Sequence, residues 1–180
     1  IRDFPRQQRT PGRDVDVSPR RPDGALQASY GPGRAPTAGL SFDGIAFGDP
    51  GTGGVPPDPI GDVGPNHYVQ MVNTAFAIYD KTGTRLTGPS DINSLWAGEG
   101  NACAGPSSGD PVVRYDAAAD RWFLSQFRIV SQSGPFHLCF AVSQAADPTG
   151  AYFLYQFTVP AFPDYFKVGV WPDAYYVGSN

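Results

Sequence analysis

The sequence contains very little of what usually builds helix surfaces. Glutamate occurs once, at Glu99, against sixteen aspartates, and lysine occurs only twice among 180 residues. The 22 glycines and 19 prolines, 41 residues together, favour turns, as aspartate does, whereas Glu and Lys favour helices. No window keeps apolar residues at positions i, i+3, i+4 and i+7. The composition therefore predicts an all-β chain with many tight turns.

Several motifs that carry chemistry are also missing. The chain has no Gly-x-Ser-x-Gly, no His-Glu-x-x-His, no CxxC and no Cys/His cluster with zinc spacing. The glycine-rich stretch 48–59 lacks the Gly-Lys-Ser/Thr ending of a phosphate loop. Ser/His/Asp catalysis and a zinc site are therefore unsupported. No apolar run is long enough to cross a bilayer, so we expect no membrane span.

Charge is divided unevenly along the chain. Residues 1–34 hold seven arginines and four aspartates, a balance of +3, whereas residues 35–180 hold six basic and thirteen acidic residues, a balance of −7. The sum is the net charge of −4. The basic stretch is short and lacks interleaved aromatic residues, so we expect no nucleic-acid binding.

Cysteine is also scarce, with only Cys103 and Cys139. Two cysteines in a chain rich in glycine and proline and poor in lysine predict one disulfide and an exported protein, secreted or held at the cell surface. The alternative is a pair of free buried thiols, because cysteine is also a small apolar residue. The chain contains no Asn-x-Ser/Thr sequon, which favours a bacterial source.

What the sequence does contain is a repeat. Three stretches begin at Asp58, Asp110 and Asp164, which are 52 and 54 residues apart. In each, a short apolar run leads to a polar turn, and a run of aromatic and β-branched residues begins about ten residues after the aspartate. A period near 50 with several short strands per unit is typical of propeller blades.

The alternation of apolar and polar residues divides the repeats into strands. The second repeat predicts four strands, at 111–115, 121–130, 136–143 and 151–159. The first predicts strands at 59–63, 68–73 and 75–80 and an irregular fourth from 85 to about 96, and the third predicts two strands. The apolar run 40–47 could add one edge strand.

These units give the predicted domain organisation. We expect residues 1–40 to form an extended arm rich in Arg, Pro and Gly, and residues 41–180 to form about two and a half four-stranded blades. Closed propellers use about four to eight blades, so the predicted ring is incomplete. We therefore expect the remaining blades to come from a larger protein or from another chain. A small β-sandwich built from the same strands is the alternative fold.

The residue pattern also resembles a known group of proteins. The stretches VGPNHYVQMVNTAFAIYDKTG, GDPVVRYDAAADRWFLSQF and FKVGVWPDAYYVG are similar to the N-terminal blades of large secreted bacterial β-propeller proteins of sialidase-like architecture. The resemblance covers about residues 56–180 and implies export and a propeller fold. The Asp-box of sialidases, Ser-x-Asp-x-Gly-x-Thr-Trp, is absent. The resemblance therefore leaves the chemistry open.

The repeat also selects the candidate site residues. If the alignment holds, Asp58, Asp110 and Asp164 lie at equivalent places around the propeller axis. Three converging carboxylates repel one another unless a cation or protons compensate, which predicts an axial Ca²⁺ or glycan site. The alternative is that each aspartate caps its own turn, since two of the three precede proline.

Two further residues are candidates for ligand binding. Trp171 could offer a ring for stacking a sugar, and Asp173, in the following turn, could add a carboxylate at the rim. Aromatic residues at alternate positions are, however, also the expected filling between blades. The two histidines, His67 and His137, are expected to be structural.

Three functions from different classes follow. We favour a secreted module that binds glycans or a partner protein, because no complete catalytic constellation is present. The alternative is a glycan-degrading enzyme, a hydrolase or lyase, whose axial carboxylates include Asp58, Asp110 and Asp164. The third is a structural subunit whose basic arm docks onto a neighbour in a larger assembly.

Overall fold

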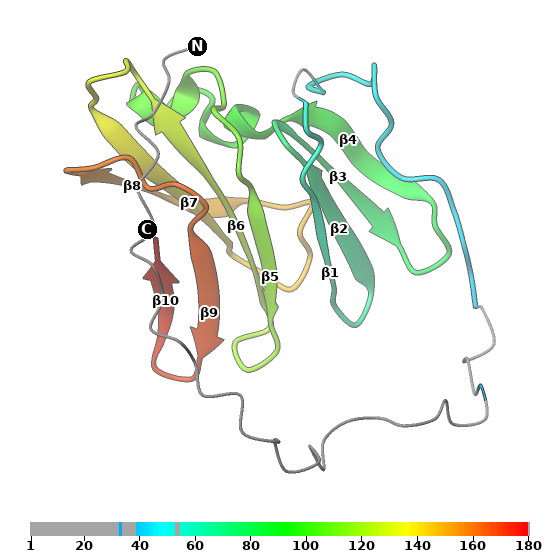
Figure 1. Cartoon of the computed structure of the whole chain (residues 1–180). Helices are drawn as coiled ribbons and strands as arrows, with labels where there is room; N and C mark the ends of the chain where they lie inside the picture. The colour runs from blue at the N-terminus through cyan, green and yellow to red at the C-terminus, as the bar shows by residue number, and fades with distance from the viewer. Residues whose placement is uncertain (1–32, 34–38, 53–54, 180) are drawn as a thin grey trace, which may run out of the picture. The chain divides into compact units, whose positions relative to one another are not determined.

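A computed structural model describes residues 33, 39–52 and 55–179 (Figure 1). The chain divides into two compact units, residues 1–37 and 38–180. Nearly all of the first unit, and with it the predicted extended arm, lies outside the described residues. In the described part of the chain, no helix is both long and apolar enough to cross a membrane.

The second unit is all-β, as the composition predicts. Its strands form three antiparallel sheets with the orders β1-β2-β3-β4, β5-β6-β7-β8 and β10-β9, named sheets A, B and C here. Sheet A consists of β1 (Pro59–Val63), β2 (His67–Val72), β3 (Ala75–Asp80) and β4 (Arg85–Asp91). Sheet B consists of β5 (Val112–Asp116), β6 (Arg121–Ile129), β7 (Phe136–Ser143) and β8 (Tyr152–Val159). Sheet C consists of β9 (Lys167–Trp171) and β10 (Ala174–Gly178).

Both four-stranded sheets are simple meanders because short polar turns join successive strands. In sheet B, the carboxylate of Asp116 accepts hydrogen bonds from the backbone N–H groups of Ala118 and Ala119, both 3.0 Å, which closes the β5–β6 turn. In sheet A, Asp80 closes the β3–β4 turn in the same way by accepting from Thr82 and Thr84. These are the aspartate turns that the sequence predicts.

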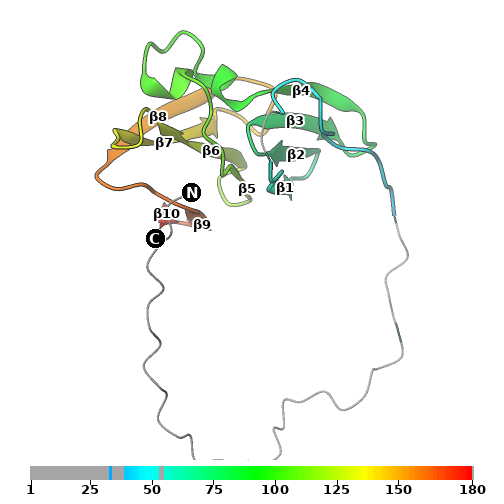
Figure 2. The ribbon, with the colours of Figure 1, turned by 45° about the horizontal axis from the view of Figure 1, so that its top comes forward.

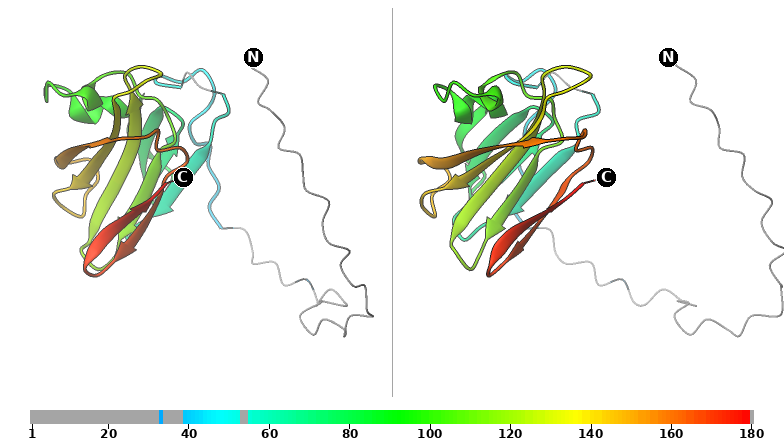
Figure 3. Two further views of the ribbon diagram at one scale, coloured as in Figure 1. Left: turned by 60° about the vertical axis from the view of Figure 1, so that its left-hand side comes forward. Right: turned by 90° about the vertical axis from the view of Figure 1, so that its left-hand side faces the viewer.

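The three sheets pack face to face through two apolar cores. The first core lies between sheets A and B and includes Val69, Ile78, Trp122 and Leu124. The second lies between sheets B and C and includes Phe123, Phe127, Phe166 and Val168. Trp122 and Phe123 are neighbours in β6 and enter opposite cores, as the period of two in a strand requires. Figure 3 shows sheet C lying against sheet B.

The first strand of each sheet lies beside the first strand of the next. β1 contacts β5, and β5 contacts β9. Figure 2 shows the sheets fanning outward from these three strands, with β4 and β8 farthest out. The end at which β1, β5 and β9 begin is called the starting end below, and it is uppermost in Figure 1.

Two of the predicted strands are corrected by the structure. Residues 40–47 form no edge strand, because the segment crosses the outer face of sheet A. There Phe42 packs against Tyr68 and Tyr79, and the backbone N–H of Ile45 donates to Oε1 of Gln70 at 2.8 Å. The irregular fourth strand of the first repeat ends at Asp91, and a 3₁₀ helix, η1 (Ile92–Trp96), takes the place of its second half.

The predicted disulfide is present. Cys103 lies in a second 3₁₀ helix, η2 (Ala102–Ala104), and is bonded to Cys139 in β7. The bond therefore fixes the loop between sheets A and B onto sheet B. Gln156 of β8 holds the same loop, since its Oε1 accepts from the backbone N–H of Ala102 at 2.8 Å.

Candidate functional site

The starting ends of the three sheets enclose a cavity of about 240 Å³. Two of the three predicted aspartates, Asp58 and Asp110, line it. Three residues that the repeat did not single out, Arg114, Tyr165 and Lys167, line it as well. Two carboxylates therefore line one cavity, together with two cationic side chains and one aromatic ring.

A shared backbone conformation marks three of these residues. Asp58, Asp110 and Tyr165 have φ angles of 40°, 46° and 50°. Such positive values are uncommon outside glycine, tolerated by aspartate and strained for a bulky residue such as tyrosine. Backbone strain of this kind is concentrated at functional sites. Each sheet thus contributes one left-handed residue to the same cavity.

The contacts in the cavity link sheet B to sheet C. The carboxylate of Asp110 accepts a hydrogen bond from the backbone N–H of Tyr165 at 3.3 Å, and Nε of Arg114 donates to the carbonyl oxygen of Val168 at 3.5 Å. The ammonium of Lys167 lies 3.0 Å from the centre of the Tyr165 ring, a cation–π contact. Asp110 and Arg114 therefore both bond to the backbone of the third repeat, and both line the cavity.

The other predicted site residues lie elsewhere. Asp164 is exposed and does not line the cavity, where Tyr165 takes the place expected for it. Trp171 and Asp173 lie at the β9–β10 turn, at the opposite end of sheet C from Lys167. The Trp171 ring is 69% exposed, and Asp173 accepts a hydrogen bond from the Tyr176 hydroxyl at 2.9 Å. Trp171 and Asp173 therefore lie away from the cavity, whereas Asp164 directly precedes the cavity residue Tyr165 without lining the cavity itself.

The charges of the cavity bear on the expected Ca²⁺. No three His, Cys, Asp or Glu residues within residues 39–52 and 55–179 are grouped so that they could hold a metal ion. Arg114 and Lys167 also place two positive charges beside the two carboxylates, which relieves the repulsion that a cation was expected to offset. Calcium binding stays a prediction, and these observations do not favour it.

One feature of the sequence explains why the repeat selected Asp164 instead of Tyr165. Asp58 and Asp110 are each followed by proline, and the third repeat has no proline after Asp164. In the first two repeats, the residue with positive φ is the aspartate itself, Asp58 or Asp110. In the third repeat it is Tyr165, the residue after Asp164, so the third repeat is offset by one residue. The missing proline was the only signal of this offset in the sequence.

A second cavity, of about 410 Å³, also opens at the starting end of sheet A. It lies where β2 and β4 end, since Val72 pairs with Ala75 and Ala75 pairs with Asp91. The polar residues of its lining are Thr52, Thr74, Asp91, Asn93 and Ser107. Hydroxyl and amide groups are therefore gathered near the first cavity, on the same end of the sheets.

Other aspartates act between sheets. Asp62 of β1 accepts from the backbone N–H of Tyr115 in β5 at 2.8 Å, and Asp116 of β5 accepts from the Tyr175 hydroxyl in β10 at 2.9 Å. Burial and this hydrogen bond to a carboxylate raise the pKa of Tyr175 to about 12. Each bond joins one sheet to the next, which is a structural role.

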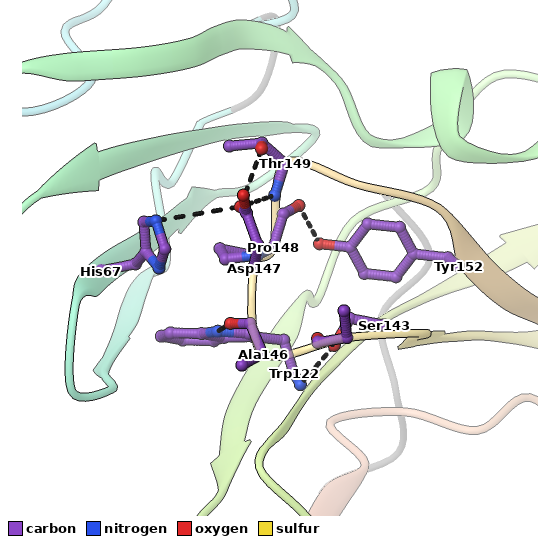
Figure 4. A network of polar contacts seen from close by, with 9 residues as sticks. His67, Trp122, Ser143, Ala146, Asp147, Pro148, Thr149 and Tyr152 are labelled. Carbon is purple, nitrogen blue, oxygen red and sulfur yellow. Dashed lines mark hydrogen bonds and ion pairs between the residues drawn. The ribbon is translucent and has the colours of Figure 1, made fainter.

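The histidines make structural contacts, as expected. Nε2 of His67 lies 3.8 Å from Oδ1 of Asp147, an ion pair between sheet A and the β7–β8 turn whenever the imidazole is protonated (Figure 4). The hydroxyl of Thr149 also donates to Asp147, at 2.7 Å, and lowers the pKa of this carboxyl group. Nδ1 of His137 lies 3.1 Å from the Thr158 hydroxyl on the neighbouring strand.

Two aromatic side chains, from β6 and β8, donate hydrogen bonds to backbone carbonyl groups of the same β7–β8 turn (Figure 4). The Tyr152 hydroxyl donates to the carbonyl oxygen of Pro148 at 2.6 Å, and burial raises the pKa of this tyrosine. The indole N–H of Trp122 donates to the carbonyl oxygen of Ala146 at 3.2 Å. Trp122 therefore packs in the core between sheets A and B, and its one polar atom has a hydrogen-bond partner.

Comparisons with protein-family models, with curated proteins and with solved structures find no match for this chain.

Proposed function

We propose that the chain is a portion of an exported β-propeller and that it binds a glycan in the cavity lined by Asp58 and Asp110. The observation that carries this proposal is that three left-handed residues, one from each sheet, meet at a single cavity between the first strands. The conformation is strained at Tyr165, and strained backbone of this kind is concentrated at functional sites, which supports a ligand site here.

The propeller part of the proposal rests on how the sheets are joined. Two successive four-stranded meanders and the first two strands of a third unit lie with β1, β5 and β9 side by side. A two-sheet sandwich would not place the first strand of each unit next to that of the following one. Propeller blades have this arrangement, because their innermost strands surround one axis.

The ligand class follows from the groups that face the cavity. Carboxylates accept hydrogen bonds from sugar hydroxyls, and the guanidinium of Arg114 and the ammonium of Lys167 donate them. The ring of Tyr165, 64% exposed, offers an apolar surface for stacking. A polyhydroxyl ligand uses all three kinds of group. The disulfide supports an oxidising, extracellular location.

The test is binding of the full chain to an array of oligosaccharides, followed by calorimetry with the best ligand. Asp58→Asn and Asp110→Asn should each weaken binding about tenfold or more, since a hydrogen bond to a charged group contributes about 1.5–3 kcal/mol. Asn keeps an acceptor for the Tyr165 backbone N–H, so folding should be preserved. Asp164→Asn is the matched control and should bind as the unaltered chain does.

Equal binding by all three variants would place the ligand elsewhere. Titration with Ca²⁺ alone, in the unaltered chain and in Asp58→Asn, tests whether a cation joins the site. A second candidate function is glycan cleavage, which the presence of two carboxylates in one cavity favours. Turnover of the bound oligosaccharide that is lost in Asp110→Asn would support the enzyme instead of the binding module.

A further inference from the structure

Half of one face of sheet B is aromatic and exposed. On β8, Tyr155 and Phe157 point to the side of sheet B that faces sheet C, and they are 46% and 50% exposed. Their neighbours Tyr152 and Leu154 point to the other side and pack into the core between sheets A and B. The same strand therefore has one covered side and one uncovered side.

The uncovered side continues an existing interface. An apolar cavity of about 330 Å³ lies beside sheet C, lined chiefly by Phe123, Phe140, Tyr155, Phe157 and Tyr175. The rings of Phe123 and Tyr175 are 5.0 Å apart between sheets B and C, and those of Phe140 and Phe157 are 5.4 Å apart on sheet B. β9 and β10 thus cover only the inner half of a surface that β7 and β8 extend outward (Figure 3).

The core between sheets A and B indicates which kind of element would cover the exposed side of sheet B. There β3 contributes Phe76 and Ile78, and η1, which follows β4, contributes Ile92 and Trp96. The outer half of sheet B is therefore covered on that side by the segment that follows the fourth strand of sheet A, since η1 contacts β8 and η2 contacts β7. In sheet C, β10 pairs only with β9 within the described residues, so the third and fourth positions of this sheet are open.

We propose that an amphipathic β-hairpin from outside these 180 residues pairs with β10 and supplies the third and fourth strands of sheet C. Backbone groups on the free edge of β10 provide the pairing, as in β-strand addition. Alternate apolar side chains of the hairpin fill the cavity beside Phe140, Tyr155 and Phe157. The inference rests on the proposed propeller arrangement but not on the glycan site.

A second copy of this chain fits the surface less well. Antiparallel pairing of two β10 strands places a two-fold axis perpendicular to the joined sheet, so both copies of sheet B lie on the same side of it. Because β7 and β8 extend beyond β10, the two copies of sheet B would overlap. A hairpin can pair with the same edge of β10 without this overlap, because it carries no second copy of sheet B.

The test uses the full chain and a synthetic peptide of residues 75–91, the β3–β4 hairpin, as the probe. Hydrogen exchange of the backbone amides in β10 should slow when the peptide is added. Phe157→Lys should weaken peptide binding about tenfold or more, as removal of a central aromatic contact does. Phe157 is half exposed, so this variant should still fold.

Two controls match the variant and the probe. Leu86→Lys replaces an apolar side chain of similar exposure, 46%, on the edge strand of sheet A and should leave peptide binding unchanged. A peptide that carries Phe76→Lys and Ile78→Lys should not bind.

Three results would overturn the proposal. Amide exchange in β10 that the peptide does not slow would exclude pairing at this edge, and binding that Phe157→Lys leaves unchanged would place the contact elsewhere. A dimer of the full chain in native mass spectrometry that Phe157→Lys dissociates would identify the occupant as a second copy. Each of these results leaves the glycan test at Asp58 and Asp110 untouched, so the two proposals fail separately.

Discussion

At the scale of the residue, the role of an aspartate in this chain depends on which groups donate hydrogen bonds to its carboxylate. Asp62 accepts from a backbone N–H of the neighbouring sheet, and Asp147 accepts from the hydroxyl and the backbone N–H of Thr149 in its own turn. Asp110 accepts from one backbone N–H of the third repeat, and its second oxygen accepts no such bond from the described residues. Turn aspartates and candidate ligands therefore look alike in sequence and differ only in their neighbours.

The turn at Asp147 allows a direct test. Removal of the hydroxyl in Thr149→Val should raise the pKa of Asp147 toward the ordinary value of about 3.9, because the hydroxyl bond is the main cause of the lowered pKa. The Thr149 backbone N–H and His67 remain, so the rise should be partial. NMR titration of the Asp147 carboxyl group measures it.

The lowered pKa also sets the sign of the pH effect on stability. Asp147 has a lower pKa folded than unfolded, so it stabilises the fold above its unfolded pKa, and this contribution is lost as the pH falls through the folded value. The unaltered chain and Thr149→Val should therefore differ in free energy of unfolding near neutral pH and converge in acid. An unchanged Asp147 pKa in Thr149→Val would refute this account of the turn.

At the scale of the element, alternation within a strand determines which core each side chain enters. β6 was expected at residues 121–130 and is found at Arg121–Ile129, with Trp122 and Phe123 on opposite sides. β4 was expected to continue to about Trp96 and ends at Asp91. Ile92 and Trp96 are buried in a 3₁₀ helix instead, so two apolar residues four apart were too few to reveal a helical turn.

The disulfide joins two elements that the repeat pattern does not pair. Cys103→Ser together with Cys139→Ser should lower the free energy of unfolding by about 4 kcal/mol, because the bond closes a loop of about 37 residues and restricts the unfolded chain. Urea unfolding followed by circular dichroism measures this loss.

Reduction of the unaltered chain is the control for the serine variant, since both remove the same cross-link. The two should unfold at similar urea concentrations. A loss below about 1 kcal/mol in both would mean that the loop holding Cys103 stays ordered in the unfolded state or that Gln156 holds it equally well.

At the scale of the whole molecule, both apolar cores are built from residues 60–175. Deletion of residues 1–37 should therefore change the free energy of unfolding of the second unit by less than about 0.5 kcal/mol, as changes outside a packed core usually do. Urea unfolding of the two chains under the same conditions measures the difference. A loss above about 1 kcal/mol would show that the first unit contributes to the fold of the second.

The sequence by itself determined the local structure of this protein. Scarce Glu and Lys, abundant Asp, Gly and Pro, and alternating apolar residues were sufficient for the all-β class and for seven of the eight strands of the first two repeats to within about two residues, because these features depend on neighbours along the chain. The disulfide could be predicted because the chain has only two cysteines. Only the tertiary structure decided which side chains share a cavity. Tyr165 replaces Asp164 beside Asp58 and Asp110, and Arg114 and Lys167 join them, because a shift of one residue in a strand start changes which side chain faces the cavity.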